Sequence, residues 1–158
     1  SDTVTLAPCA QWKIVFTECC RQSSIINLSG SSGASLYIET MLNNSTAPNS
    51  SPKTAADPAL RINGPTTVPI VATDVEGDSI AYSLLPARDN GATPLNYASG
   101  YGAAQPLGAN GLVLYQGAGT MLLQPQATGK YALVVRTSDY RAGTLVGYSE
   151  RDWILSAM

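Results

Sequence analysis

The feature that most constrains the fold is a repeated alternation of apolar and polar side chains in short segments. The first example is Trp12, Ile14 and Phe16, which alternate with Lys13 and Thr17. The same period of two recurs in segments 36–39, 80–84 and 131–135. Because successive side chains of a β-strand point to opposite faces, this period predicts strands with one face in a core.

Further apolar runs and the turns between them extend this pattern along the chain. The runs predict strands at 69–72, 111–115, 120–123, 144–148 and 152–155, which brings the total to about nine. Turn-forming clusters rich in Gly, Asn and Ser separate the strands at 29–33, 63–65, 89–91, 110–111 and 141–143. Since helical periodicity is hard to find, these strands and turns predict an all-β sandwich or barrel.

The segment 43–58 is almost free of large apolar residues and predicts a linker or an exposed connection. It divides the chain into residues 1–48 and residues 49–158, and the second part has the size of one sandwich. The first part holds two or three strands, too few for independent stability. We expect it to pack on the larger unit as an N-terminal β extension, or else to complete a neighbouring module.

Composition argues against several classes of function. The nine basic residues are scattered, so no basic stripe favours nucleic-acid binding. There is no histidine, which removes the commonest general base and a common metal ligand. No apolar run reaches the ~20 residues of a membrane-spanning helix, so we expect no direct membrane insertion.

An acidic loop contains Asp74, Glu76 and Asp78 with no basic residue among them. Carboxylates crowded in this way repel one another, and a hard divalent cation relieves the repulsion by accepting their oxygens as ligands. Gly77 permits the sharp turn that such convergence needs. The Gly and Glu spacing of an EF-hand is absent, and a solvated acidic turn is the alternative.

The three cysteines, Cys9, Cys19 and Cys20, all lie near the start of the chain. Neighbours in a strand point to opposite faces, so only one of Cys19 and Cys20 can face Cys9. We expect either one disulfide from Cys9 to Cys19 or Cys20, or buried free thiols. Three cysteines without histidine do not make the usual zinc site.

Three further features could have a functional role, but each also has an ordinary structural explanation. Asp139 follows a predicted strand, where aspartate most often forms a turn. Arg151 and Asp152 suggest a surface charge pair worth at most ~1 kcal/mol. The Gly-rich segment 97–111 presents Tyr97 and Tyr101 for recognition of a glycan or protein, or else is a packed loop.

Taken in order, two parts of the sequence resemble cadherin-like and PKD-like repeats of bacterial surface proteins. The opening is Asn-Ser-Ser-Pro at 49–52 followed by ATDVEGDSIAYSL at 72–84. The closing half is Gly129-Lys130-Tyr131 with Leu133, Val135 and Asp139. Smaller motifs are similar to those of large secreted Bacteroidetes proteins of the gliding-motility and type IX sorting kind: Cys19-Cys20-Arg21, Ile25 with Asn27, Tyr101 with Gln105-Pro106-Leu107, and Arg151-Asp152.

The resemblance implies an all-β, antiparallel sandwich of the immunoglobulin-like and cadherin-like kind. It also implies a calcium site formed by Asp74, Glu76 and Asp78, with Asn49 and Asp139 as further contributors. Glu76 departs from the family's usual Asp, and a further Cys often found before the acidic loop is missing. The resemblance also implies a piece of a longer extracellular or cell-surface protein, with neighbouring repeat domains as partners.

Three functions follow as hypotheses. The first is a non-catalytic structural or adhesive module stabilised by calcium. The second is a domain that binds a surface glycan or protein ligand through Tyr97 and Tyr101. The third is a glycoside hydrolase with two catalytic carboxylates, which we expect least, because the acids cluster on one tight loop.

Overall fold

The computed structural model describes residues 5–54 and 61–158, and this part contains eleven strands and one short 3-10 helix. The strands are β1 (Trp12–Glu18), β2 (Leu36–Leu42), β3 (Lys53–Thr54), β4 (Arg61–Ile62), β5 (Thr66–Pro69), β6 (Ala72–Thr73), β7 (Ser79–Leu85), β8 (Leu112–Tyr115), β9 (Thr120–Leu123), β10 (Gly129–Arg141) and β11 (Thr144–Ala157), with η1 (Asn90–Ala92) between β7 and β8. The last two predicted strands, 144–148 and 152–155, are one continuous strand, β11. Of the predicted linker 43–58, residues 55–58 lie outside the described part.

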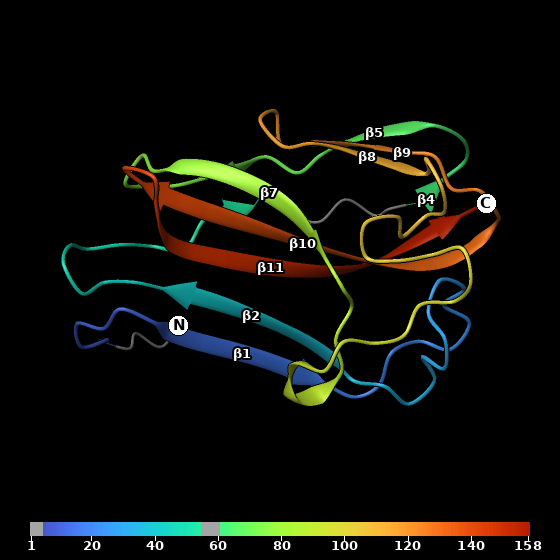
Figure 1. Cartoon of the computed structure of the whole chain (residues 1–158), viewed down its shortest axis with the longest axis horizontal. Helices are drawn as coiled ribbons and strands as arrows, with labels where there is room; N and C mark the ends of the chain where they lie inside the picture. Colours follow the sequence, from blue (N-terminus) through green and yellow to red (C-terminus); the bar gives the residue numbers. More distant parts are fainter. Residues whose placement is uncertain (1–4, 55–60) are drawn as a thin grey trace.

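The strands form a sandwich of a large sheet and a smaller one. The large sheet has the order β1-β2-β11-β10-β7, with β4 beside β11, and the smaller sheet has the order β5-β9-β8. Neighbouring strands are antiparallel except β4, which runs parallel to β11. Figure 1 shows β5, β8 and β9 as a layer above β10 and β11, with β1 and β2 extending the large sheet below. The predicted all-β, antiparallel sandwich is confirmed.

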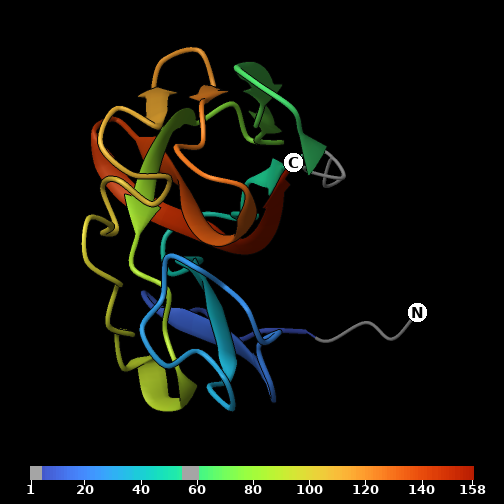
Figure 2. The same cartoon turned by 90° about the vertical axis from the view of Figure 1, so that its right-hand side faces the viewer.

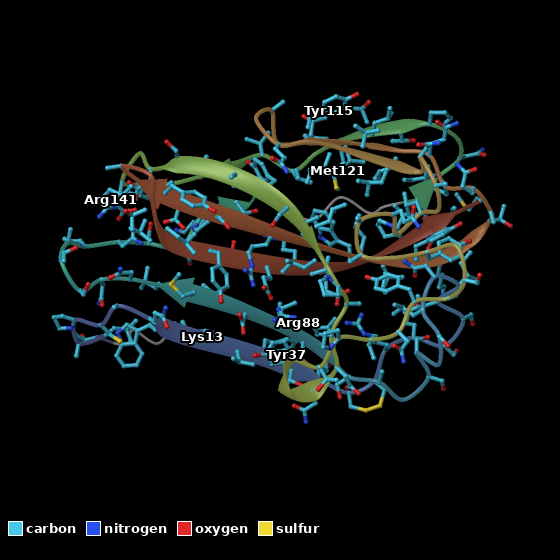
Figure 3. All side chains as sticks on the ribbon, in the orientation of Figure 1. Lys13, Tyr37, Arg88, Tyr115, Met121 and Arg141 are labelled. Carbon is cyan, nitrogen blue, oxygen red and sulfur yellow. A yellow bond between two sulfur atoms is a disulfide. The ribbon has the colours of Figure 1, made fainter. Side chains whose placement is uncertain are left out.

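Strand β10 is buried on both of its faces, which is why its apolar run is nearly continuous. One face presents Tyr131, Leu133 and Val135 to the core between the two sheets. Across this core, Met121 and Leu123 of β9 are completely buried, and Figure 3 labels Met121 between the layers. The other face of β10 packs against the N-terminal part of the chain.

This second contact is made by the segment between β1 and β2. Ile25 and Leu28 pack against Ala132 and Val134 of β10. Asn27 is fully buried between them, and its side-chain amide accepts from the N–H of Ala132 at 2.9 Å and donates to its carbonyl oxygen at 2.8 Å. The N-terminal strands and the larger unit therefore share one sheet and adjoining cores, and the boundary near residue 48 stays a prediction.

The β1–β2 hairpin does not bury the face that its sequence pattern indicated. Ile14 is 61% exposed and Phe16 is 52% exposed, although the alternation predicted both in a core. In β2 the buried side chains are Tyr37, Glu39 and Met41, which lie on the opposite face from Leu36 and Ile38. This prediction was wrong because β1 forms the edge of the large sheet, beyond the strands that the smaller sheet covers. Figure 2 shows β1 and β2 below β10 and β11, away from the smaller sheet.

Candidate metal centre

Three carboxylates meet at one end of the sandwich, where β7 begins and β10 turns into β11. Asp74 and Asp78 come from the loop between β6 and β7, and Asp139 comes from β10. One oxygen of each lies within 4.8 Å of an oxygen of the other two. Figure 3 labels Arg141 at this end of the molecule. The structure thus brings together three of the five residues predicted as metal ligands.

The acidic loop is fixed by a hydrogen bond between its own residues. The backbone N–H of Asp78 donates to Oδ1 of Asp74 at 2.8 Å, so the Asp74 side chain closes the turn. Gly77 has a φ of +81°, a conformation that costs a glycine little. The spacing of Asp74, Gly77 and Asp78 therefore places both carboxylates on one side of the loop.

Asp139 does not form a turn, as its position after a predicted strand suggested, because β10 continues to Arg141. It lies opposite Ile80 on one side and Gly147 on the other, just before an irregularity in the β10–β11 register. By strand alternation it faces the core side that Leu133 and Val135 also face. A Cβ at Gly147 would come within 2.5 Å of the Asp139 carboxylate, so this glycine makes the space that the carboxylate occupies.

The Asp139 carboxyl group is fully buried, and neither of its oxygens accepts a hydrogen bond of normal geometry, although Asn49 and the backbone lie close enough to interact with it. Asn49 lies near it, but the Asn49 amide donates to the carbonyl oxygen of Val146 at 2.9 Å. Burial, with the charges of Asp74 and Asp78, raises the pKa of Asp139 to about 6, although Asn49 and the backbone lower it in part. Oδ2 of Asp74 is likewise buried without a partner. Buried acceptor oxygens without a good hydrogen bond lower the stability of the folded state unless a ligand binds them.

Arg141 adds a positive charge to the cluster of carboxylates. Its guanidinium donates to both carboxylate oxygens of Asp78, at 2.9 and 2.7 Å, and to Oδ1 of Asn49 at 3.1 Å. Three ionised carboxylates and one guanidinium leave a formal charge of minus two at the cluster. A bound divalent cation would neutralise that charge.

The geometry permits a hard divalent cation such as calcium. Two oxygens that are each ~2.4 Å from an ion can lie at most ~4.8 Å apart, and the three carboxylates meet this limit. The donors are all hard oxygens, which calcium prefers. A carboxylate oxygen has two lone pairs, so Asp78 can keep its bond to Arg141 and still bind a cation. The remaining positions around calcium would go to water or to the Asn49 side-chain oxygen.

Glu76 and Asn49, the other two predicted ligands, lie outside the carboxylate triad. Glu76 is exposed, and its carboxylate accepts a hydrogen bond from the Ser50 hydroxyl at 2.7 Å. This contact ties the acidic loop to the 49–52 segment. Asn49 is half-buried beside Arg141 and Asp139, so it remains a candidate for a further ligand.

Replacing Gly147 with alanine should destabilise the protein by about 1–3 kcal/mol and weaken any response to calcium. The added methyl group would displace the Asp139 carboxylate. The φ of Gly147 is outside the left-handed region, so the effect would come from this contact and not from the backbone conformation. Thermal melts with and without calcium would measure both effects. Gly117→Ala is the control, because nothing lies within 4 Å of its Cβ position. Equal behaviour of the two variants would contradict the packing of Asp139 against Gly147.

A second group of charged residues, which the sequence analysis missed, fills the gap between β2 and β11. These strands pair only from Thr40 to Leu42, and where they diverge the Glu39 N–H donates to the Glu150 carboxylate at 3.0 Å. Arg88 and Arg136 both form ion pairs with Glu150. Figure 3 shows Arg88 close to Tyr37, and its guanidinium lies over the Tyr37 ring at 4.7 Å.

Glu39 is the second buried carboxylate of this group. The hydroxyls of Tyr148 and Tyr37 donate to it at 2.5 and 2.9 Å. Burial opposes its ionisation, but these hydrogen bonds and nearby cations outweigh burial and lower the pKa of Glu39. Both Glu39 and Glu150 are thus held by several donors, which suits a structural role.

Asp152 is not part of a surface charge pair, as its sequence position had suggested. Its side chain is completely buried and makes two hydrogen bonds with the guanidinium of Arg21, whose side chain is 1% exposed. Arg21 also donates to the carbonyl oxygens of Ser35 and Arg88, both at 3.1 Å. This ion pair therefore joins β11 to the segments on either side of it.

The cysteines pair differently from the prediction. Cys19 and Cys20 form a disulfide with each other, and Cys9 is free. The predicted pairing was wrong because β1 ends at Glu18, so neither Cys19 nor Cys20 lies in the strand. Cys19 and Cys20 are exposed, which also excludes the alternative of buried free thiols at these positions.

Tyr97 and Tyr101 are both packed inward. The Tyr97 hydroxyl accepts from the N–H of Ala87 at 3.1 Å, and the Tyr101 ring packs edge-on against Tyr131 with ring centres 5.9 Å apart. These positions fit the packed-loop alternative. Both residues are partly exposed, so recognition of a ligand through this loop stays a prediction.

Comparisons with protein-family models, with curated proteins and with solved structures find no match. Within residues 5–54 and 61–158, no helix has the length and apolar character that crossing a membrane requires.

Proposed function

We propose that this chain is a non-catalytic structural or adhesive module of a cell-surface or secreted protein, stabilised by calcium at Asp74, Asp78 and Asp139. The observation that carries the proposal is the Asp139 carboxyl group. It is fully buried, accepts no hydrogen bond of normal geometry and lies against two further carboxylates. A bound cation would satisfy all three groups at once.

A calcium ion at this position would act mainly on stability. It would link the loop between β6 and β7 to β10, and hence to the turn between β10 and β11. Such a link stiffens one end of the sandwich, as a module under load or in a row of modules requires. The resemblance of segment 72–84 to cadherin-like repeats supports this role and an extracellular location.

Three further carboxylates with buried side chains support a non-catalytic role. Glu39, Glu150 and Asp152 are buried, and each is bonded to arginine or tyrosine side chains. General acid–base catalysis by two carboxylates needs groups that face a substrate across a gap. These three instead face protein donors.

Calcium should raise the melting temperature of protein that has first been stripped with EDTA. At a hundredfold excess over the dissociation constant, binding to the folded state contributes about 2.7 kcal/mol. For a domain of this size that corresponds to a rise of about 5–10 °C. Glu76→Gln is the matched control and should keep the full rise, because Glu76 lies outside the triad. Identical melts in EDTA and in calcium would refute the proposal.

A further inference from the structure

Strand β1 is a free edge of the large sheet. It pairs with β2 over seven residues in an unbroken register, and no other described strand pairs with it. Natural edge strands are usually prevented from pairing with other chains by proline, bulges, several charges or short length. The sequence of β1, WKIVFTE, has no proline, no glycine and no bulge. Its outer backbone groups are therefore able to pair with another strand.

The three central residues of β1 are consecutive, apolar and exposed. Ile14 is 61%, Val15 is 47% and Phe16 is 52% exposed. Because side chains alternate along a strand, Val15 lies on one face of the sheet while Ile14 and Phe16 lie on the other. A partner that covers one face would leave the other face open. Only a strand added to the edge brings neighbours to all three residues.

We propose that β1 pairs with β1 of a second copy of this chain, antiparallel, around a two-fold axis perpendicular to the sheet at Val15. This symmetry keeps each face of the sheet on the same side in both copies. Val15 then lies opposite Val15 of the second copy, and Ile14 lies opposite Phe16 of the second copy. Apolar and aromatic cross-strand pairs of this kind stabilise antiparallel strands.

The charges at the ends of β1 favour this register. Lys13 faces Thr17 of the second copy, and Trp12 faces Glu18, so no like charges meet. An axis at Phe16 would instead place Ile14 opposite Glu18. An axis at Ile14 would place Lys13 opposite Val15 and would shorten the paired length.

The interface is small, so the dimer should dissociate on dilution. One pair of seven-residue strands lies well below the ~1,200–2,000 Å² that stable interfaces bury. Self-association by this route extends the sheet across two molecules, and it does not depend on the proposed calcium site.

Sedimentation velocity over a range of concentrations tests the proposal, with Val15→Lys and Val15→Glu as the variants. Each variant places two like charges opposite each other at the two-fold axis, so each should associate at least tenfold more weakly than the original chain. An equal mixture of the two should recover the dimer, because lysine then faces glutamate. Val71→Lys, at another exposed apolar position, should associate as the original chain does.

Recovery in the mixture is the result that supports the register, since a loss caused by misfolding would not be restored by mixing. A monomer at every concentration of the original chain would overturn the proposal. So would a dimer that persists in Val15→Lys, or a mixture that stays monomeric.

Discussion

Replacing Arg21 with methionine is expected to lower the free energy of unfolding by about 3–5 kcal/mol. The substitution leaves Asp152 with no cation beside it in a site where its side chain is 0% exposed. It also removes the donors to the carbonyl oxygens of Ser35 and Arg88. Burial already raises the pKa of Asp152, and Arg21 opposes that rise, so the variant should take up a proton at Asp152.

Chemical denaturation at neutral pH measures this loss, which corresponds to a fall of roughly 6–20 °C in melting temperature. The control is the double variant Arg21→Met with Asp152→Leu. It removes the unpaired charge and should recover most of the stability, because a buried ion pair is often replaceable by apolar groups of similar size. A single variant as stable as the original chain would show that the ion pair is not buried in solution.

Replacing Asp139 with asparagine is expected to stabilise the protein in EDTA at pH 7, by up to about 3 kcal/mol. In the folded chain Asp139 has a pKa of about 6, above its usual value of 3.8, mainly because of burial. Between these two values the folded state binds more protons than the unfolded state, so stability falls as the pH rises. Above pH 6 the cost stays constant at about 3 kcal/mol, and asparagine removes it.

Calcium should reverse this order. The ion stabilises the original chain by binding the ionised carboxylates, whereas Asp139→Asn lacks one of them and should gain little. Melting curves of both proteins, in EDTA and in calcium, give the four values needed. An asparagine variant that is less stable than the original chain in EDTA at pH 7 would contradict the burial cost of Asp139.

The acidic loop was predictable because its chemistry is local. Asp74, Gly77 and Asp78 lie within one turn, and their spacing alone indicates converging carboxylates. The position of Asp139 was not predictable in this way. It depends on the register that places β10 beside both β7 and β11, and on the space at Gly147. Glu76 belongs to the sequence cluster, but its side chain turns toward Ser50.

The buried ion pairs, by contrast, could not be predicted from the sequence pattern. Arg21 and Asp152 are 131 residues apart, and charged residues are ordinarily expected at the surface. Alternation in β1 and β2 predicted the strands correctly but gave the wrong buried face. Which face is covered depends on the strands that reach it, and the smaller sheet does not extend over this hairpin.

Calorimetric titration of calcium into EDTA-stripped protein tests whether the three carboxylates bind the ion. We expect saturable binding at one site per chain, retained in Glu76→Gln and lost in Asp139→Asn. Absence of saturable binding, or equal binding by the original chain and Asp139→Asn, would contradict a calcium site formed by Asp74, Asp78 and Asp139.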